Sequence, residues 1–201
     1  MTIIPEAKKL KIVKRYLSPN PYSRSQRKIQ NQLAVVIHWT ANPGADANQN
    51  RNFFENKSNG KSGYGSAHYI VGQNGEVIQC IPETEVAYHC GSSLLDPASG
   101  KVYTDLARAK LGEYANNPQF QSPNNCTFGI ELCPVDNDGN FTEATLKSAA
   151  ELCAAILKRY NLTTDDILTH QDIVGWKDCP KNWAKQPEKM ADFKARVAEF
   201  A

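Results

Sequence analysis

The sequence predicts a mixed α/β fold: one domain with a central mixed β-sheet flanked by helices. Short runs of strand character recur at 33–39, 66–72, 76–81, 127–133 and 166–170, and most are rich in β-branched residues. Segments with apolar residues at helical spacing lie between or after several of these runs. A length of 201 residues suffices for one domain with a sizeable core.

The composition excludes several classes of protein. The chain has 23 Lys and Arg against 21 Asp and Glu, a formal net charge of +2, so it lacks the basic excess of a dedicated nucleic-acid binder. With 41% hydrophobic residues it is not a disordered chain. The apolar run 33–37 is too short to cross a bilayer, and residues 1–16 contain no signal-peptide core. We therefore expect no nucleic-acid partner and no membrane insertion.

Residues 1–30 are predicted to be a basic N-terminal extension, and residues 31–201 the domain itself. The segment 18–23 is rich in turn-forming residues and is typical of a connector. We expect either a solvated arm that lies over the domain or a contact with an anionic surface. The basic residues of this extension include Lys8, Lys9, Lys11, Lys14 and Arg15.

The first half of the domain predicts strands joined by one helix. The run 33–39 is a buried strand, and a helix follows across 48–56. The dipeptide Asn-Gly between the runs 66–72 and 76–81 predicts a hairpin, because both residues tolerate positive φ. A further short strand is expected at 86–90.

The second half begins with a long loop. Residues 91–126 are predicted to be a loop with one or two helical turns, and loops of this length are usually functional or mobile. The run 127–133 is a strand, and Thr142 caps a helix that ends near Asn161. The sequence Asp-Asn-Asp-Gly before that helix is a turn, since its spacing does not fit a calcium loop.

The remaining elements are a strand, a loop and a helix. The run 166–170 is predicted to be a strand, and 171–183 an irregular loop. Pro187 opens a last helix with an apolar face. The six cysteines could form a disulfide framework, but without a signal-peptide core we expect mostly reduced thiols, with at least one available to a metal. The cysteines are Cys80, Cys90, Cys126, Cys133, Cys153 and Cys179.

Two histidines and a cysteine lie at or after the ends of predicted strands. His38 interrupts the run 33–39, His170 ends the run 166–170, and Cys179 follows nine residues later. Either histidine alone is also compatible with a hydrogen-bonded core residue. The three together match a catalytic zinc site, in which three protein ligands leave a fourth position open. We therefore predict one Zn²⁺ per chain, bound by His38, His170 and Cys179.

A carboxylate and an ammonium group are candidates for catalysis at this site. Lys177 lies two residues before Cys179, so in an extended loop both side chains point the same way. Its charge would stabilise an oxyanion beside a metal, although a surface lysine is the alternative. Glu131 lies inside the apolar strand 127–133, where a carboxylate must be paired or retained for chemistry. It is therefore either a general base or one partner of a structural salt bridge.

His68 and His89 are weaker candidates. His68 lies in the first arm of the predicted hairpin, and His89 follows the second arm. Either could donate to a substrate carbonyl, orient a metal ligand or simply be packed in the core.

Four segments together resemble the type-2 N-acetylmuramoyl-L-alanine amidases, the zinc amidase fold shared by phage endolysins, bacterial autolysins and peptidoglycan recognition proteins. The likeness is greatest to endolysin and autolysin catalytic domains of Gram-positive type. The matching segments are VVIHWTANPG (35–44), SAHYIVGQNGEVIQCIPETEVAYHCG (66–91), FGIELCP (128–134) and HQDIVGWKDCP (170–180).

The resemblance implies roles for the residues singled out above. It implies that His38, His170 and Cys179 hold Zn²⁺ and that Glu131 and Lys177 are catalytic. It also implies the substrate, the amide between the lactyl group of N-acetylmuramic acid and the first L-alanine of the stem peptide. Peptidoglycan is then the partner, and the activity is bacteriolytic degradation of the cell wall.

The resemblance also directs attention to a substrate groove. We expect Trp39, His68, His89 and the loop 91–126 to contribute to the groove that receives glycan and peptide. Because no signal-peptide core is present, we expect synthesis in the cytoplasm and action on the cell wall after holin-type release or non-classical export.

Two departures from the family pattern matter. Some members place a catalytic tyrosine immediately before the hairpin histidine, where this chain has Ala67. Others use aspartate as the third ligand, where this chain has Cys179, whose thiolate is expected to bind the metal. The chain thus resembles the branch that uses the strand glutamate.

Two other functions remain alternatives. The first is a non-catalytic peptidoglycan-binding module of the recognition-protein type, against which the presence of the three ligands together with Glu131 and Lys177 argues. The second is a thiol hydrolase with Cys179 as nucleophile and His170 as base.

Overall fold

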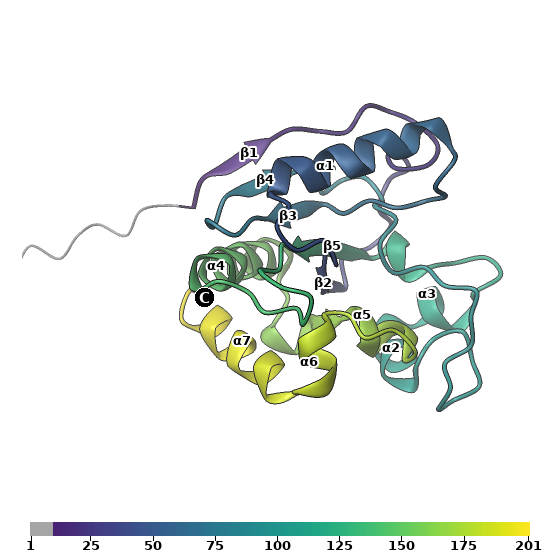
Figure 1. Cartoon of the computed structure of the whole chain (residues 1–201). Helices are drawn as coiled ribbons and strands as arrows, with labels where there is room; N and C mark the ends of the chain where they lie inside the picture. Colours follow the sequence, from purple (N-terminus) through teal and green to yellow (C-terminus); the bar gives the residue numbers. More distant parts are fainter. Residues whose placement is uncertain (1–9) are drawn as a thin grey trace, which may run out of the picture.

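The structure, a computed structural model, describes residues 10–201, which form a six-stranded sheet with helices on both faces (Figure 1). The strand order is β1-β4-β3-β5-β2-β6; β3 and β4 are antiparallel, and the other neighbouring pairs are parallel. The predicted fold class is therefore confirmed. The strands are β1 Ile12–Lys14, β2 Ala34–Trp39, β3 Tyr69–Val71, β4 Val77–Gln79, β5 Thr127–Leu132 and β6 Ile167–Thr169. The α-helices are α1 Ala47–Asn56, α2 Asp105–Leu111, α3 Glu113–Asn116, α4 Glu143–Tyr160, α5 His170–Val174, α6 Lys181–Lys185 and α7 Glu188–Ala198, and short 3₁₀ helices are η1 Lys57–Asn59, η2 Pro123–Asn125 and η3 Thr164–Asp166.

One face of the sheet is covered by α4 and α7. Side chains from β2, β3, β4, β5 and β6 pack there against the apolar faces of both helices, with Phe128 and Phe193 fully buried. The hydroxyl of Thr142 accepts from the backbone N–H of Thr145 and caps α4, which ends at Asn161 in the left-handed conformation. Both ends of this helix are as predicted, because capping is a local signal.

The opposite face is covered by two separate groups of helices. Helix α1 packs on β3 and β4 through Phe54, Ile70 and Ile78. Helices α2, α3 and α5 pack on β2 and β6, where Val36 and Leu168 are buried. Figure 1 shows α1 beside β3 and β4 and shows α2 and α5 at the other end, with β5 and β2 between them. The seam between the two groups lies over β5 and β2.

The predicted hairpin is confirmed. The N–H of Gly72 donates to the carbonyl of Glu76 at 2.9 Å, and β3 and β4 pair in register on either side of the turn. Gly75 has φ +77°, and a Cβ atom there would lie 2.7 Å from Ser148 Oγ. Backbone conformation and space therefore both require glycine at this position.

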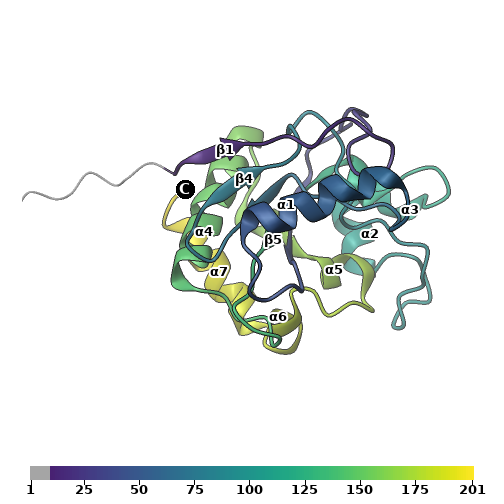
Figure 2. The same ribbon diagram turned by 45° about the horizontal axis from the view of Figure 1, so that its top comes forward.

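The described part of the predicted extension is packed onto the domain. Strand β1 pairs in parallel with β4, as Figure 2 shows at the edge of the sheet. Leu17 is 1% exposed, and its N–H donates to the carbonyl of Cys80 at 2.9 Å. The basic residues Lys8 and Lys9 lie outside the described residues. The boundary at residue 30 stays a prediction, but residues 10–30 do not form a free arm.

Two expectations about local structure are wrong. Residues 86–90 form no strand, because the N–H of Val86 donates to the carbonyl of Arg27 instead of to a strand of the sheet. The stretch 171–183 is not wholly irregular, since it contains most of α5 and the first turn of α6. Helix α5 starts with a capping box between Thr169 and Asp172, a signal that the sequence analysis overlooked. The helical turns expected within 91–126 are confirmed as α2 and α3.

Within residues 10–201, none of the helices combines the length and the apolar character that crossing a bilayer requires.

All six cysteines are free and buried, as expected for reduced thiols. Burial raises the pKa of the Cys80, Cys90 and Cys133 thiols to about 12. The unfolded chain ionises its thiols at about 8.5. The pKa of these thiols is thus higher in the folded protein than in the unfolded chain. Their contribution to the stability of the fold is therefore fully present below about pH 8.5 and is lost as the pH rises from there toward 12.

We therefore expect the five thiols other than Cys179 to resist a chromogenic disulfide reagent at pH 8 in the folded protein. Burial keeps them protonated and out of reach, and the thiolate is the reactive form. All six should react after unfolding in denaturant. Rapid native modification of any of the five would contradict this packing.

Candidate metal centre

The strands bring the predicted site residues to one edge of the sheet. Strands β2, β5 and β6 are parallel, so their carboxyl ends meet at that edge, where ligands bind in open α/β sheets. His38 in β2 is in register with Glu131 in β5. Ile37 is in register with Thr169, so His170, the first residue of α5, follows beside His38.

His38, His170 and Cys179 form a buried cluster, and their donor atoms all lie within 4.8 Å of one another. The Nδ1 atoms of His38 and His170 are 3.1 Å apart, and the Cys179 sulfur is 3.7 Å from His38 Nδ1. Ideal zinc bond lengths in a tetrahedron give about 3.3 Å between two nitrogens and about 3.6 Å between nitrogen and sulfur. Two imidazoles and a thiol at these separations fit a zinc ion.

Hydrogen bonds fix which nitrogen of His38 faces the cluster. The carbonyl of Thr127 accepts only, so His89 Nε2, which lies 3.3 Å away, carries the proton. Burial lowers the pKa of both His38 and His89 well below the usual value, so both rings are neutral. His89 Nδ1 therefore accepts from His38 Nε2 at 3.0 Å. The lone pair of His38 is left on Nδ1, the atom that faces His170 and Cys179.

His89 is thus a positioning residue for a metal ligand. The space for its ring exists because residue 129 is glycine: a Cβ atom there would lie 2.6 Å from His89 Cγ. Orienting a metal ligand is one of the alternatives that the sequence left open for His89, and its hydrogen bond with His38 fits that alternative.

Replacement of His89 by alanine is expected to weaken zinc binding by about 10- to 100-fold, because His38 loses the acceptor that orients it. Competition with a chromophoric chelator measures this affinity. His89→Gln retains an acceptor and a donor on one side chain and should lie closer to the parent. Equal zinc affinities of the parent and His89→Ala would refute the positioning role.

Glu131 lies beside the cluster in an unusual environment. Its Oε2 atom is buried and has no hydrogen-bond partner among the described residues. Burial raises the pKa of this carboxyl group to about 8, and the charge of Lys177 acts in the opposite direction. The absence of a structural salt bridge to Glu131 within residues 10–201 favours the general-base alternative.

A cavity of about 760 Å³ opens above the cluster. Glu131, His170 and Lys177 line it, whereas His38 and Cys179 lie below its lining. The exposed Lys177 is thus placed over the same cavity as Glu131, as predicted. Ser92, Ser93 and Asn124 also line the cavity, so part of the loop 91–126, which we expect at the substrate groove, lies here. No pattern in the sequence indicated the other lining side chains, which include Arg27, Tyr64, Tyr88 and Trp176.

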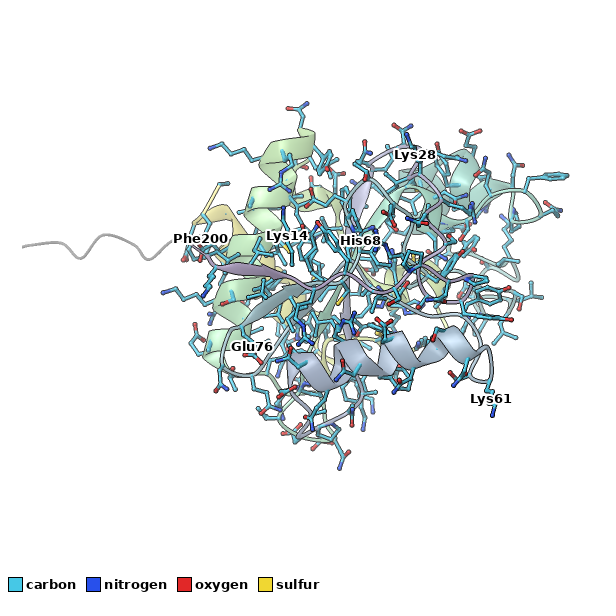
Figure 3. The ribbon with its side chains drawn as sticks, turned by 90° about the horizontal axis from the view of Figure 1, so that it is seen from above. Lys14, Lys28, Lys61, His68, Glu76 and Phe200 are labelled. Carbon is cyan, nitrogen blue, oxygen red and sulfur yellow. The ribbon has the colours of Figure 1, made fainter. Side chains whose placement is uncertain are left out.

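Two expected substrate-binding residues are not brought into this cavity. His68 is fully buried near the centre of the molecule, as Figure 3 shows. Its Nδ1 accepts from the N–H of Gly129 at 3.1 Å, and its Nε2 donates to the carbonyl of Glu85 at 2.9 Å. The ring of Trp39 faces Lys181, whose Nζ atom is 6.0 Å from the ring centroid. His68 is therefore a core histidine, and Trp39 is not among the residues that line the cavity.

Comparisons with known proteins identify the family of this chain. The family model described as N-acetylmuramoyl-L-alanine amidase matches residues 28–182. A probable N-acetylmuramoyl-L-alanine amidase of Bacillus licheniformis is 32% identical over 188 residues, which cover 94% of this chain and 47% of that protein. The N-acetylmuramoyl-L-alanine amidase BlyA of Bacillus subtilis (strain 168) is 34% identical over 183 residues, 90% of this chain and 45% of BlyA.

A solved structure shows the same fold. The catalytic domain of XlyA superposes with a TM-score of 0.66 at 22% identity, covering 94% of this chain and 99% of that domain.

The chain spans about half the length of the curated relatives it matches. Since the family model covers most of its residues, the chain belongs to the N-acetylmuramoyl-L-alanine amidase family.

Proposed function

We propose that this chain hydrolyses the amide bond between N-acetylmuramic acid and L-alanine in peptidoglycan, with one zinc ion per chain. One observation carries the proposal: three clustered metal-binding side chains, of which His170 lines the cavity, share it with an ammonium group and with a carboxyl group whose Oε2 atom has no hydrogen-bond partner among residues 10–201. Family membership and the names of the relatives support the same reaction and substrate.

His38, His170 and Cys179 would hold the zinc ion, because two imidazoles and a thiolate are a donor set that zinc favours. The ion would supply a Lewis acid at the floor of the cavity. Three protein ligands are typical of catalytic zinc sites, whereas structural sites usually have four.

Glu131 would move the proton in the reaction. As a carboxylate it accepts a proton from the water that attacks the lactyl carbonyl carbon, and it then delivers that proton to the alanine nitrogen as the C–N bond breaks. The products are the free lactyl carboxyl group and a new amino terminus on L-alanine. The Lys177 ammonium group, at the same cavity, stabilises the negative charge that develops on the carbonyl oxygen.

The arrangement favours this reaction over the two alternatives. A binding module needs neither Glu131 nor Lys177 at the cavity. A thiol hydrolase needs a nucleophile that substrate can reach, but Cys179 is 2% exposed and lies below the lining.

Digestion of purified cell walls by the zinc-loaded chain tests the proposal. New L-alanine amino termini should appear, and mass analysis of the products should show glycan strands separated from intact stem peptides. Walls that are bound but gain no new L-alanine amino termini would support the binding module. Hydrolysis that is abolished by alkylation and unaffected by chelators would support the thiol hydrolase.

A further inference from the structure

The segment that precedes the family match contributes Arg27 to the lining of the cavity. The match begins at residue 28. Arg24 forms a double hydrogen bond with Glu85, with both N–O distances 2.8 Å, and the N–H of Val86 donates to the carbonyl of Arg27 at 2.7 Å. Arg27 itself lines the cavity. This segment therefore adds to the cavity wall a part that the family-matched region does not supply.

Tyr22 of the same segment supports the loop that carries Tyr64. The carbonyl of Tyr22 accepts from the N–H of Gly65 at 3.0 Å. Its ring lies against Gly60, where φ is +74° and a Cβ atom would approach the Tyr22 ring to 2.7 Å. Figure 3 labels Lys61, which belongs to this loop. Tyr22 thus contacts the loop on both sides of Tyr64.

Three tyrosines form a continuous aromatic wall. The ring centroids of Tyr22 and Tyr64 are 5.4 Å apart, and those of Tyr64 and Tyr88 are 5.5 Å apart. Tyr64 and Tyr88 line the cavity, and Tyr64 is 67% exposed. Tyr88 directly precedes His89, whose ring contacts that of His38. Tyr64 and Tyr88 therefore line the same cavity as His170, one of the three clustered donors.

An exposed aromatic wall in a polar cavity suits a sugar better than a peptide. A pyranose ring has a face of C–H groups that packs on an aromatic ring, and its rim of hydroxyl and acetamido groups bonds to nearby polar side chains. Such polar groups are present at this cavity in Arg27, Ser92 and Asn124. A stem peptide that starts with alanine offers a methyl group and carboxylates, which call for cations more than for rings.

We propose that Tyr64 and Tyr88 form a saccharide subsite that binds N-acetylated sugar rings of the glycan strand. The inference rests on the proposed function, because the sugar attached to the scissile amide must then lie in the cavity that Glu131 and both tyrosines line. The segment that contains Tyr22 holds this subsite in place.

Binding of a peptide-free tetrasaccharide of alternating N-acetylglucosamine and N-acetylmuramic acid tests the subsite, measured by calorimetry on the full chain without added zinc. The parent should bind, Tyr64→Phe should bind within about twofold of the parent, and Tyr64→Ala should bind at least about tenfold more weakly. Phe120→Ala is the matched control, since that ring is 87% exposed and does not line the cavity. Because Tyr64 is largely exposed, its truncation should leave the far-UV circular dichroism unchanged.

Several outcomes would overturn the subsite: no binding to the parent, equal binding to Tyr64→Ala, or a Tyr64 effect seen with free stem peptide in place of the sugar. The ligand contains no scissile amide, so this result is independent of hydrolysis. Tetrasaccharide binding that depends on Tyr64, together with no new L-alanine amino termini in digested walls, would contradict only the proposed function. New L-alanine amino termini without such binding would contradict only the subsite.

Discussion

Glu131→Gln should lower kcat for hydrolysis of the N-acetylmuramic acid–L-alanine amide by about 10²- to 10⁴-fold, the range typical of general acid–base catalysis. The amide has the shape of the carboxyl group but cannot accept the proton from the attacking water. The side chain is not one of the three clustered donors, so zinc content should stay at the level of the parent. The steady-state rate at which L-alanine amino termini appear gives kcat, and metal analysis gives the zinc content.

The pKa of the Glu131 carboxyl group is raised by burial, so a neutral glutamine suits the same site and the fold should be retained. Thermal unfolding checks this. Glu143→Gln is a control, since that carboxylate is exposed and pairs with Arg196 far from the cavity in sequence and fold. Retained turnover in Glu131→Gln would remove this residue from the mechanism.

Removal of zinc should abolish turnover and also destabilise the fold. A ligand that binds only the native state stabilises it by about 4 kcal/mol at a free concentration about 1,000 times its Kd. In a domain of this size, each 1 kcal/mol shifts Tm by about 2–4 °C. Treatment with a chelator should therefore lower Tm, and added Zn²⁺ should restore both Tm and activity.

His170→Ala provides the matched variant for this experiment. It lacks one of the three donors, so neither its Tm nor its activity should respond to added Zn²⁺. If the parent is active after exhaustive chelation, or if His170→Ala gains Tm on zinc addition as the parent does, the three-residue metal site is refuted.

Alternation along strands explains why much of the site could be predicted. In β2 and β5, a period of two residues places His38 and Glu131 on the face opposite the large apolar side chains, and the register then sets them side by side. The expectation that Lys177 and Cys179 lie at one site came from their local spacing. The face on which each of these side chains lies can be predicted because it depends on geometry within one short segment.

The roles of His68 and His89 depend on contacts between distant segments. Both lie in runs with strand character, and only the partners of their ring nitrogens separate a core histidine from a positioning one. Those partners come from residues 17 to 61 positions away. Tyr64 lies in a loop without periodicity, so no pattern in the sequence indicated that it lines the cavity.

The pairing of β1 with β4 could not be predicted for the same reason, because Ile12 and its partner Val77 are far apart in the sequence.

The pairing of β1 with β4 also affects self-association of the protein. An uncovered edge strand presents unpaired backbone groups to other molecules and promotes aggregation. Strand β1, with Lys14 at its end, covers β4 with a very short and charged edge. A version of the chain beginning at the family match would keep His38, His170 and Cys179, yet it would leave β4 open to pairing with a second copy.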